Sequence, residues 1–250
     1  MPEPTEHKES AEEQNPTEMS PVEDPKSITD TQEIEKVTVE EEKDNMPNQV
    51  VIVNNLPTSQ TELLKSKQVY LVGDITEDKS EEIMAALLYV SELQTREEPE
   101  DPEDPESPLK KVYDPIEIIV STYGGSVVDM FAMYDTIRYL REKHLIKVRA
   151  LGKVMSAGVL LIAAGSPGYR EIGKNCRVMI HNVSAGYHGT ITNIQNEIKE
   201  VEWLQKKYIS CLAEETGMKK SKIRKMLDSG LDVYLSAQKA LKFGIVDRVI

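Results

Sequence analysis

Residues 152–165 read Gly-Lys-Val-Met-Ser-Ala-Gly-Val-Leu-Leu-Ile-Ala-Ala-Gly, and we interpret them as the element around which the rest of the chain is organised. It opens with small residues and one hydroxyl, and residues 159–164 are wholly apolar. A short apolar run without polar positions is typical of a helix that is buried on every side. Packing gives no reason for a serine at the start of such a helix, so Ser156 calls for a separate explanation.

Two interpretations of Ser156 remain open at this point. Backbone N–H groups at a helix N-terminus are unpaired and favour negative charge, so an oxygen nucleophile and its oxyanion would be stabilised there. Serine is also a preferred capping residue, and capping alone would explain its presence. The nucleophile elbow pattern Gly-x-Ser-x-Gly is absent, because Val154 occupies the first glycine position.

Strand and helix patterns alternate on both sides of the central stretch. Strands are predicted at residues 68–72, 116–121, 146–151, 177–180 and 245–250, and helices follow residue 78, residue 126 and Ser236, with a long amphipathic helix at 192–215 and a short one at 221–227. Asp78 with Glu81 resembles a capping box. Strand and helix in alternation predict an α/β fold with parallel βαβ units.

Gly124 and Gly125 lie between the end of one predicted strand and the start of a helix. A glycine pair there allows the backbone to approach a bound group closely, although it could also make only a tight turn. Neither the Walker pattern nor the dinucleotide fingerprint is present, so a phosphate loop is not indicated.

His181 directly follows a predicted strand, and Asp232 lies in a loop. Ser156, His181 and Asp232 are the three residue types of a hydroxyl nucleophile activated by an oriented base. Each also has a structural explanation: Ser156 as a cap, His181 as a buried ring and Asp232 as a turn residue. His188 is a rival base in a turn-like Tyr-His-Gly context.

The charge of −13 is unevenly distributed, because residues 1–50 hold fifteen Asp and Glu against four Lys. Residues 1–48 are predicted to be a disordered acidic tail, residues 49–66 a linker or docking segment, and residues 67–250 the folded domain. The acidic, Pro-rich residues 97–108 are predicted to be an extended surface loop. The near-neutral remainder argues against nucleic acid as a partner.

Cys176 and Cys211 lie far apart and show no metal-binding spacing. No signal-peptide pattern is present, and no apolar run approaches the roughly 20 residues that a membrane span needs. A reduced cytoplasmic setting without a membrane is therefore expected.

Residues 67–250 resemble the proteolytic subunit of the Clp protease, a self-compartmentalising serine peptidase of family S14. The resemblance rests on Gly124-Gly125-Ser126-Val127, Met155-Ser156-Ala157-Gly158, Arg177-Val178-Met179-Ile180-His181, and Asp232-Val233-Tyr234-Leu235-Ser236-Ala237 with Phe243-Gly244-Ile245-Val246-Asp247. It implies a crotonase-like ββα superhelix, heptameric rings, an ATP-driven AAA+ unfoldase as partner and unfolded polypeptides as substrates. No metal or cofactor is implied, because only the unfoldase would use ATP.

The resemblance also implies a role for each candidate residue. Ser156 would be the nucleophile, His181 the general base and Asp232 the group that orients His181. The backbone N–H groups of Gly125 and Ala157 would form the oxyanion hole, in agreement with the reading of the glycine pair.

Some positions depart from the family pattern. Thr122-Tyr123 stands where the family commonly has Ser-Pro, and Leu231 and Val233 flank Asp232 where the family has an arginine that takes part in contacts between rings. Four alternatives stay open: a catalytically weak ring or interaction subunit, a non-catalytic one, an ATP-independent processing protease of the capsid-maturation type, and an acyl-CoA enzyme of the same superfamily.

Overall fold

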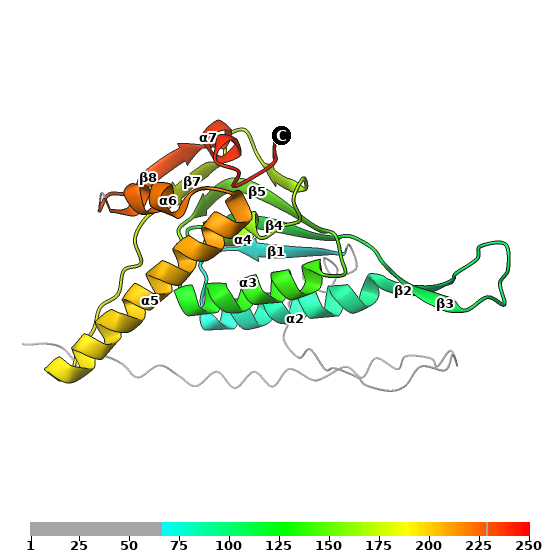
Figure 1. The fold of residues 1–250 in the computed structure, drawn as a ribbon, viewed down its shortest axis with the longest axis horizontal. Coiled ribbons are helices and arrows are strands. Elements are labelled where there is room, and N and C mark those ends of the chain that lie inside the picture. Colours follow the sequence, from blue (N-terminus) through cyan, green and yellow to red (C-terminus); the bar gives the residue numbers. More distant parts are fainter. Residues whose placement is uncertain (1–66, 229) are drawn as a thin grey trace, which may run out of the picture. The chain divides into compact units, whose positions relative to one another are not determined.

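The computed structural model describes residues 67–228 and 230–250, and Figure 1 shows how their elements are arranged. The helices are α2 (Glu77–Leu93), α3 (Val127–Arg141), α4 (Gly158–Ala163), α5 (Ile191–Thr216), α6 (Lys220–Leu227) and α7 (Ala237–Lys242). The strands are β1 (Gln68–Val72), β2 (Thr95–Pro99), β3 (Leu109–Tyr113), β4 (Ile116–Thr122), β5 (Ile146–Met155), β6 (Arg170–Ile172), β7 (Arg177–Ile180), β8 (Val233–Ser236) and β9 (Arg248–Val249).

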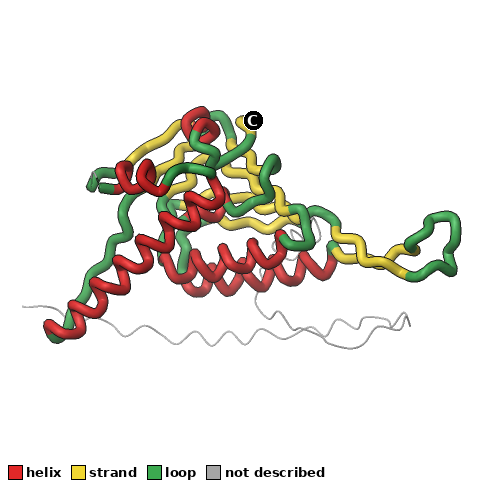
Figure 2. The backbone as a smooth tube through the Cα atoms, viewed as in Figure 1, coloured by secondary structure: helices red, strands yellow, loops and turns green. Residues whose placement is uncertain are grey.

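A mostly parallel, seven-stranded sheet forms the centre of the described fold. In Figure 2 its strands are yellow and the helices are red. The strands β1, β4, β5, β6 and β9 follow one another in that order, while β7 pairs with β5 and β8 pairs with β7. Only the β7–β8 pair within this sheet is antiparallel. The prediction of an α/β fold with parallel strands is confirmed.

Strand β5 supports the site because its two halves pair with different neighbours. Residues 148–150 pair with β6, and residues 153–155 pair with β7. Gly152 lies between the halves with φ 67°, a conformation that favours glycine. The sequence analysis placed Gly152 in the element that opens the buried helix, whereas the structure continues the strand to Met155 and starts α4 at Gly158.

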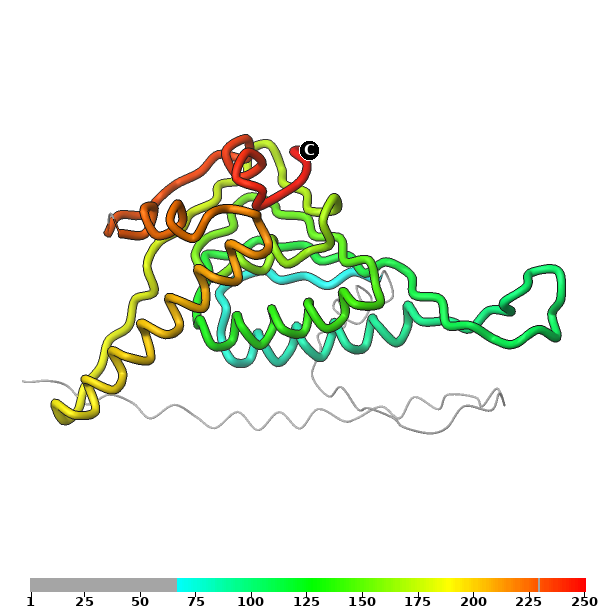
Figure 3. Tube along the Cα trace, in the orientation of Figure 1, coloured from blue at the N-terminus to red at the C-terminus, as the bar shows by residue number. Residues whose placement is uncertain are grey.

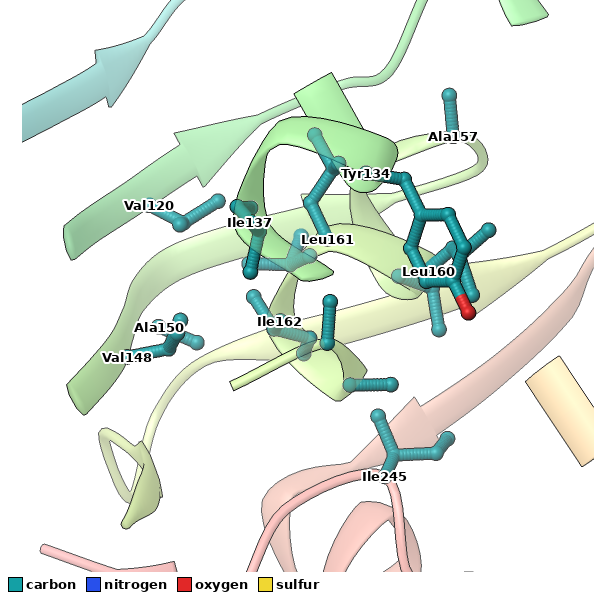
Figure 4. Close-up of a cluster of buried hydrophobic side chains, with 14 of the residues drawn as sticks. Val120, Tyr134, Ile137, Val148, Ala150, Ala157, Leu160, Leu161, Ile162 and Ile245 are labelled. Carbon is teal, nitrogen blue, oxygen red and sulfur yellow. The ribbon is translucent and has the colours of Figure 1, made fainter. Parts of the chain in front are cut away.

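Helices pack against this sheet and bury the core. Helix α4 is buried at each of its six residues and lies next to β5, α3 and α5. In Figure 4 its residue Ile162 lies between the sheet residues Val148 and Ala150 and the side chain of Ile245 near the end of the chain. Helices α2 and α3 run side by side in Figures 1 and 3. The central stretch is therefore the core helix that its apolar sequence predicts.

The helix starts agree with the sequence in one case and differ in another. Ser126 caps α3, and the buried residues of this helix are Met130, Met133, Tyr134, Ile137 and Leu140. Helix α2 begins instead after Thr76, whose side chain accepts a hydrogen bond from the Lys79 backbone N–H. The predicted capping box at Asp78 and Glu81 is wrong, because Thr76 is the capping residue and both Asp78 and Glu81 lie inside the helix.

Residues 97–108 are only partly the extended loop that the sequence predicts. Strands β2 and β3 form an antiparallel hairpin that includes residues 97–99, and the loop proper follows. Asp101 and Asp104 accept backbone hydrogen bonds from Glu103 and Glu106, so turns replace the fully extended chain. Figure 1 shows the hairpin extending from the end of α2.

Other boundaries are close to their predictions. Strands β1 and β7 have the predicted bounds, whereas the closing strand is reduced to Arg248–Val249. The predicted tail at residues 1–48 and the segment at 49–66 lie outside the described residues. Within the part of the chain that the structure describes, no helix is long and apolar enough to cross a membrane.

Candidate active site

Ser156 lies in the turn between the end of β5 and the start of α4. Its φ of 54° is in the left-handed region, which costs a residue with a side chain about 1–2 kcal/mol. Three hydrogen bonds hold it there: its N–H donates to Met179, and its carbonyl accepts from the Val159 N–H and the Tyr208 hydroxyl. Strain that surrounding contacts enforce in this way is a recurrent feature of functional sites.

His181 lies directly after β7, the strand that pairs with the last residues of β5. Its Nε2 is 2.7 Å from the Oγ of Ser156, a hydrogen-bond distance for a hydroxyl and its base. Ala157 is the N-cap residue of α4, and it makes no side-chain hydrogen bond. Ser156 is therefore not the capping residue of α4, and its hydroxyl is directed to His181 instead.

Asp232 lies one residue before β8 and is exposed. Strands β7 and β8 pair Ile180 with Val233, so His181 and Asp232 are the next facing positions along the two chains. Such neighbours have Cβ atoms about 4.5–5.5 Å apart in a regular ladder. Among the described residues, however, no hydrogen bond joins the Asp232 carboxylate to the His181 ring. The structure thus brings Ser156 and His181 together, and it leaves Asp232 one register position beyond the last β7–β8 pair, opposite His181 and without a hydrogen bond to it.

Gly125 and Ala157 face the same cavity of about 210 Å³. Neither of their backbone N–H groups has a hydrogen-bond partner among the described residues, so both are free to donate. The cavity wall contains the nucleophile candidate, its base, one residue each of α3 and α5, and loop residues, namely Tyr123, Gly125, Val127, Ser156, Ala157, His181, Asn182, Val183, Ser184 and Tyr208. Two free N–H groups beside a serine can stabilise an oxyanion.

Tyr208 is a site residue that the sequence analysis missed. It lies on α5, is 5% exposed and donates its hydroxyl to the Ser156 carbonyl over 3.3 Å. Burial raises the pKa of this hydroxyl, so it stays protonated and remains a donor. The sequence showed Tyr208 only as one member of the apolar stripe of a helix, and no spacing marks it as a contact of Ser156.

The segment after His181 is held by a polar contact with α5. The Gln205 side chain accepts from the Val183 N–H over 2.8 Å and donates to the Asn182 side chain over 2.6 Å. Asn182 in turn donates to the Leu227 carbonyl at the end of α6. These contacts hold Asn182 and Val183, the two residues that follow His181, in place.

The other histidines of the described chain do not approach Ser156. His188, the rival base, is exposed in the loop before α5, and no hydrogen bond of its ring is found among the described residues. His144 is buried, with its ring nitrogens 3.0 Å from Ser91 Oγ and 2.9 Å from the Asp114 carbonyl. His144 is thus a structural residue.

No group of three or more His, Cys, Asp or Glu side chains in the described residues could hold a metal ion. The two cysteines are buried, and burial raises the pKa of the Cys176 thiol to about 11. A thiol with so high a pKa is a poor nucleophile at neutral pH. Ser156 is therefore the better candidate nucleophile.

A comparison with models of protein families matches residues 108–250 to the family described as Clp protease. The matched range is more than half of the chain. It contains Ser156, His181 and Asp232 as well as both backbone groups that face the cavity.

Proposed function

The chain belongs to the Clp protease family and is thus a peptidase, and we propose that it is a serine endopeptidase that cleaves unfolded polypeptides through an acyl-enzyme on Ser156. The observation that carries the proposal is the 2.7 Å contact between Ser156 Oγ and His181 Nε2. A hydroxyl becomes a nucleophile when an adjacent base takes its proton, and this distance permits that transfer.

Acylation requires a proton to move and a negative charge to be held. Ser156 Oγ attacks the scissile carbonyl carbon while His181 Nε2 takes the hydroxyl proton and then donates it to the leaving amine. The carbonyl oxygen becomes an oxyanion, which the N–H groups of Gly125 and Ala157 stabilise. Water, activated by His181, then hydrolyses the ester and restores Ser156.

Asp232 is assigned the role of orienting His181 and stabilising its imidazolium. The facing positions of the two residues beyond the β7–β8 ladder support this role. A rotation of the two side chains toward each other would complete the triad, because regular ladder spacing already brings them close enough.

Assembly belongs to the proposal as well. Family membership supports rings, with heptamers and an AAA+ unfoldase as the expected form, and a cytoplasmic location. If a ring encloses the site, the choice of substrate would depend largely on which polypeptides can enter the ring, because the cavity at Ser156 is small.

A second candidate function is a ring subunit with weak or absent activity. The observation that favours it is the exposed Asp232 carboxylate, which has no hydrogen bond to His181 in the described structure. Loss of the orienting carboxylate lowers kcat of a triad enzyme by about 10⁴-fold.

The test is labelling with a fluorophosphonate probe, with the adduct located by mass spectrometry. We expect an adduct on Ser156 in the parent chain, none in Ser156→Ala, and a loss of labelling in His181→Ala. His188→Ala is the matched control, because this histidine is exposed in the nearby loop, and it should label like the parent. The second candidate would be favoured if the parent labels slowly and Asp232→Asn does not reduce the labelling rate further. Equal labelling of His181→Ala and the parent would exclude the proposed mechanism.

A further inference from the structure

The register of three strands gathers a set of side chains on one face of the sheet. Lys153 pairs with Arg177 across β5 and β7, and Met179 pairs with Tyr234 across β7 and β8. Alternate residues of a strand point to the same face, and the intervening Val154 and Val178 are completely buried. Lys153, Arg177 and Tyr234 therefore lie on the face away from that buried side.

Each of the two cations on this face lies over an aromatic ring. Lys153 Nζ is 4.4 Å from the ring centroid of Tyr123, and Arg177 Cζ is 5.9 Å from that of Tyr234. The rings are 61% and 49% exposed, so the contacts are open to solvent. Both distances are within the roughly 6 Å of a cation–π interaction, which positions a cation without neutralising it. We call these four residues, Tyr123, Lys153, Arg177 and Tyr234, the aromatic-basic patch.

The cations of the patch have no anionic partner. Neither Lys153 nor Arg177 forms an ion pair with a carboxylate among residues 67–228 and 230–250. Most arginines of the sheet and helices differ in this respect: Arg149 and Arg248 both pair with Glu171, and Arg141 pairs with Glu215. In a chain with a net charge of −13, two unpaired cations on one face leave a local positive field that an incoming carboxylate could use.

The patch is continuous with the candidate active site. Tyr123 lines the cavity that contains Ser156. Arg177 and Met179 alternate along β7, and His181 follows directly after the end of this strand, which puts Arg177 about 13 Å from His181 at roughly 3.3 Å per residue. An extended polypeptide with its scissile bond at Ser156 would thus bring a side chain about four residues away to Arg177.

From these observations we propose that the aromatic-basic patch binds an acidic side chain of the polypeptide substrate and so selects substrates with Asp or Glu about four residues from the scissile bond. The proposal rests on the proposed function, because it treats the cavity at Ser156 as the place of cleavage. The Lys153 ammonium and the Arg177 guanidinium would donate to the carboxylate, and the two tyrosine rings would hold the cations in place.

Binding can be measured without turnover in the Ser156→Ala chain. The probes are two fluorescein-labelled unstructured peptides of identical sequence, one with Glu and one with Gln four residues to each side of a central apolar pair. We expect a Kd about tenfold lower for the Glu peptide at low salt, and a smaller difference at 0.5 M salt, because the charges are exposed. Lys153→Gln combined with Arg177→Gln should remove the preference and leave the Kd of the Gln peptide unchanged.

The matched control removes a lysine and an arginine elsewhere. Lys143 lies over the Tyr139 ring at 5.8 Å, outside the cavity wall, and Arg224 is exposed on α6. Lys143→Gln combined with Arg224→Gln removes the same number of positive charges and should keep the tenfold preference. A preference that falls equally in both double variants would reflect overall charge and overturn the proposal.

Two further outcomes separate the possibilities. Fluorophosphonate labelling of Ser156 in the Lys153→Gln, Arg177→Gln chain should equal that of the parent. Failure of labelling in the parent itself would overturn the proposed function. The preference for the Glu peptide would still test the aromatic-basic patch in that case. An unlabelled peptide of residues 1–48 is the competitor. Displacement of the Glu peptide by this competitor at a concentration far below the Kd of the Glu peptide would assign the patch to the chain's own acidic segment and overturn its assignment to substrate.

Discussion

Gly124 sets the position of Ser156 at the scale of single residues. Its φ is +98°, and a Cβ atom built on it would lie 2.7 Å from the Ser156 Cβ and 2.8 Å from the Met155 carbonyl oxygen. Both distances are shorter than real carbon contacts, so a side chain would have to displace the serine. Gly124 is therefore required for its lack of a side chain, because its own N–H donates to the Thr122 hydroxyl, and only the N–H of Gly125 is free.

The substitution Gly124→Ala should thus reduce both the stability of the protein and the reactivity of Ser156. We expect a loss of about 2–4 kcal/mol in the free energy of unfolding, from the positive φ and the contact together. Labelling of Ser156 by a fluorophosphonate should fall at least a hundredfold, because even a displacement of about 1 Å has that cost. Urea unfolding and the labelling rate of the folded protein measure the two effects separately.

Gly73→Ala is the control for this prediction. Gly73 has a similar φ of +95°, and nothing lies within 4 Å of a Cβ atom built on it. The control should lose only the roughly 1–2 kcal/mol of backbone strain and label at the parental rate. Equal labelling rates in the two variants would show that Gly124 does not position Ser156.

The sequence could predict some site residues and not others. Ser156 and His181 were predicted from residue type, position after a strand and family resemblance, and the structure places them within hydrogen-bond distance. Tyr208 lies more than fifty positions from Ser156 in sequence, and its contact depends on how α5 crosses the site. The orientation of the Asp232 side chain likewise depends on the local loop, which residue type does not determine.

At the scale of elements, a buried carboxylate joins α5 to α3. Glu215 has a 4% exposed side chain and pairs with Arg141 and with Arg138, while Tyr134 donates to it over 2.9 Å. Arg141 also donates to the Ala164 carbonyl at the end of α4. One glutamate thus connects three helices that surround the active-site turn.

Glu215→Gln should destabilise the protein by about 2–3 kcal/mol, because it leaves Arg141 without a carboxylate and Arg138 with only the exposed Glu214. Burial alone would raise the pKa of Glu215, but hydrogen bonds from Arg141, Arg138 and Tyr134 lower it. The contribution of ionised Glu215 to the free energy of unfolding is then fully present above the unfolded pKa of about 4.5, and it is lost as the pH falls through the lower pKa of the folded state. Urea unfolding from pH 7 to pH 3 should show the gap between parent and variant closing at low pH.

The neighbouring glutamate provides the comparison. Glu214 also pairs with Arg138, at 2.9 Å, but its side chain is 60% exposed. Exposed ion pairs contribute less than about 1 kcal/mol, so Glu214→Gln should change stability little at any pH. A loss as large as that of Glu215→Gln would attribute the effect to net charge rather than to burial.

Elements with a strong local pattern were predicted well, and elements defined by pairing were not. The strands β1 and β7 are short, mostly apolar runs with clear ends, and their bounds agree. Strand β6 is the three residues Arg170–Ile172, two of them charged, and it is a strand only because β5 and β9 pair with it. The hairpin strands β2 and β3 were missed for a similar reason, since like charges and proline conceal the pairing.

At the scale of the whole molecule, α5 continues beyond the core that buries its C-terminal half. Its apolar residues recur along one stripe, and Tyr208 and Leu212 at the C-terminal end are buried. At the N-terminal end of the same stripe, Ile191 is 77% exposed and Ile198 is 50% exposed. In the proposed assembly, a second copy of the chain covers this end of the helix.

Ile198→Glu should therefore weaken assembly without unfolding the protomer. A buried isoleucine contributes about 1.5–3 kcal/mol per copy, and a charge in its place adds the cost of desolvation, so the loss multiplies over the copies of a ring. Light scattering after size-exclusion chromatography should show a smaller oligomer at micromolar concentration, while the far-UV circular dichroism stays that of the parent. Leu109→Glu is the control, because Leu109 is 61% exposed on the β2–β3 hairpin, and it should keep the parental mass. An unchanged mass for Ile198→Glu would place the contacts between copies on another face than α5.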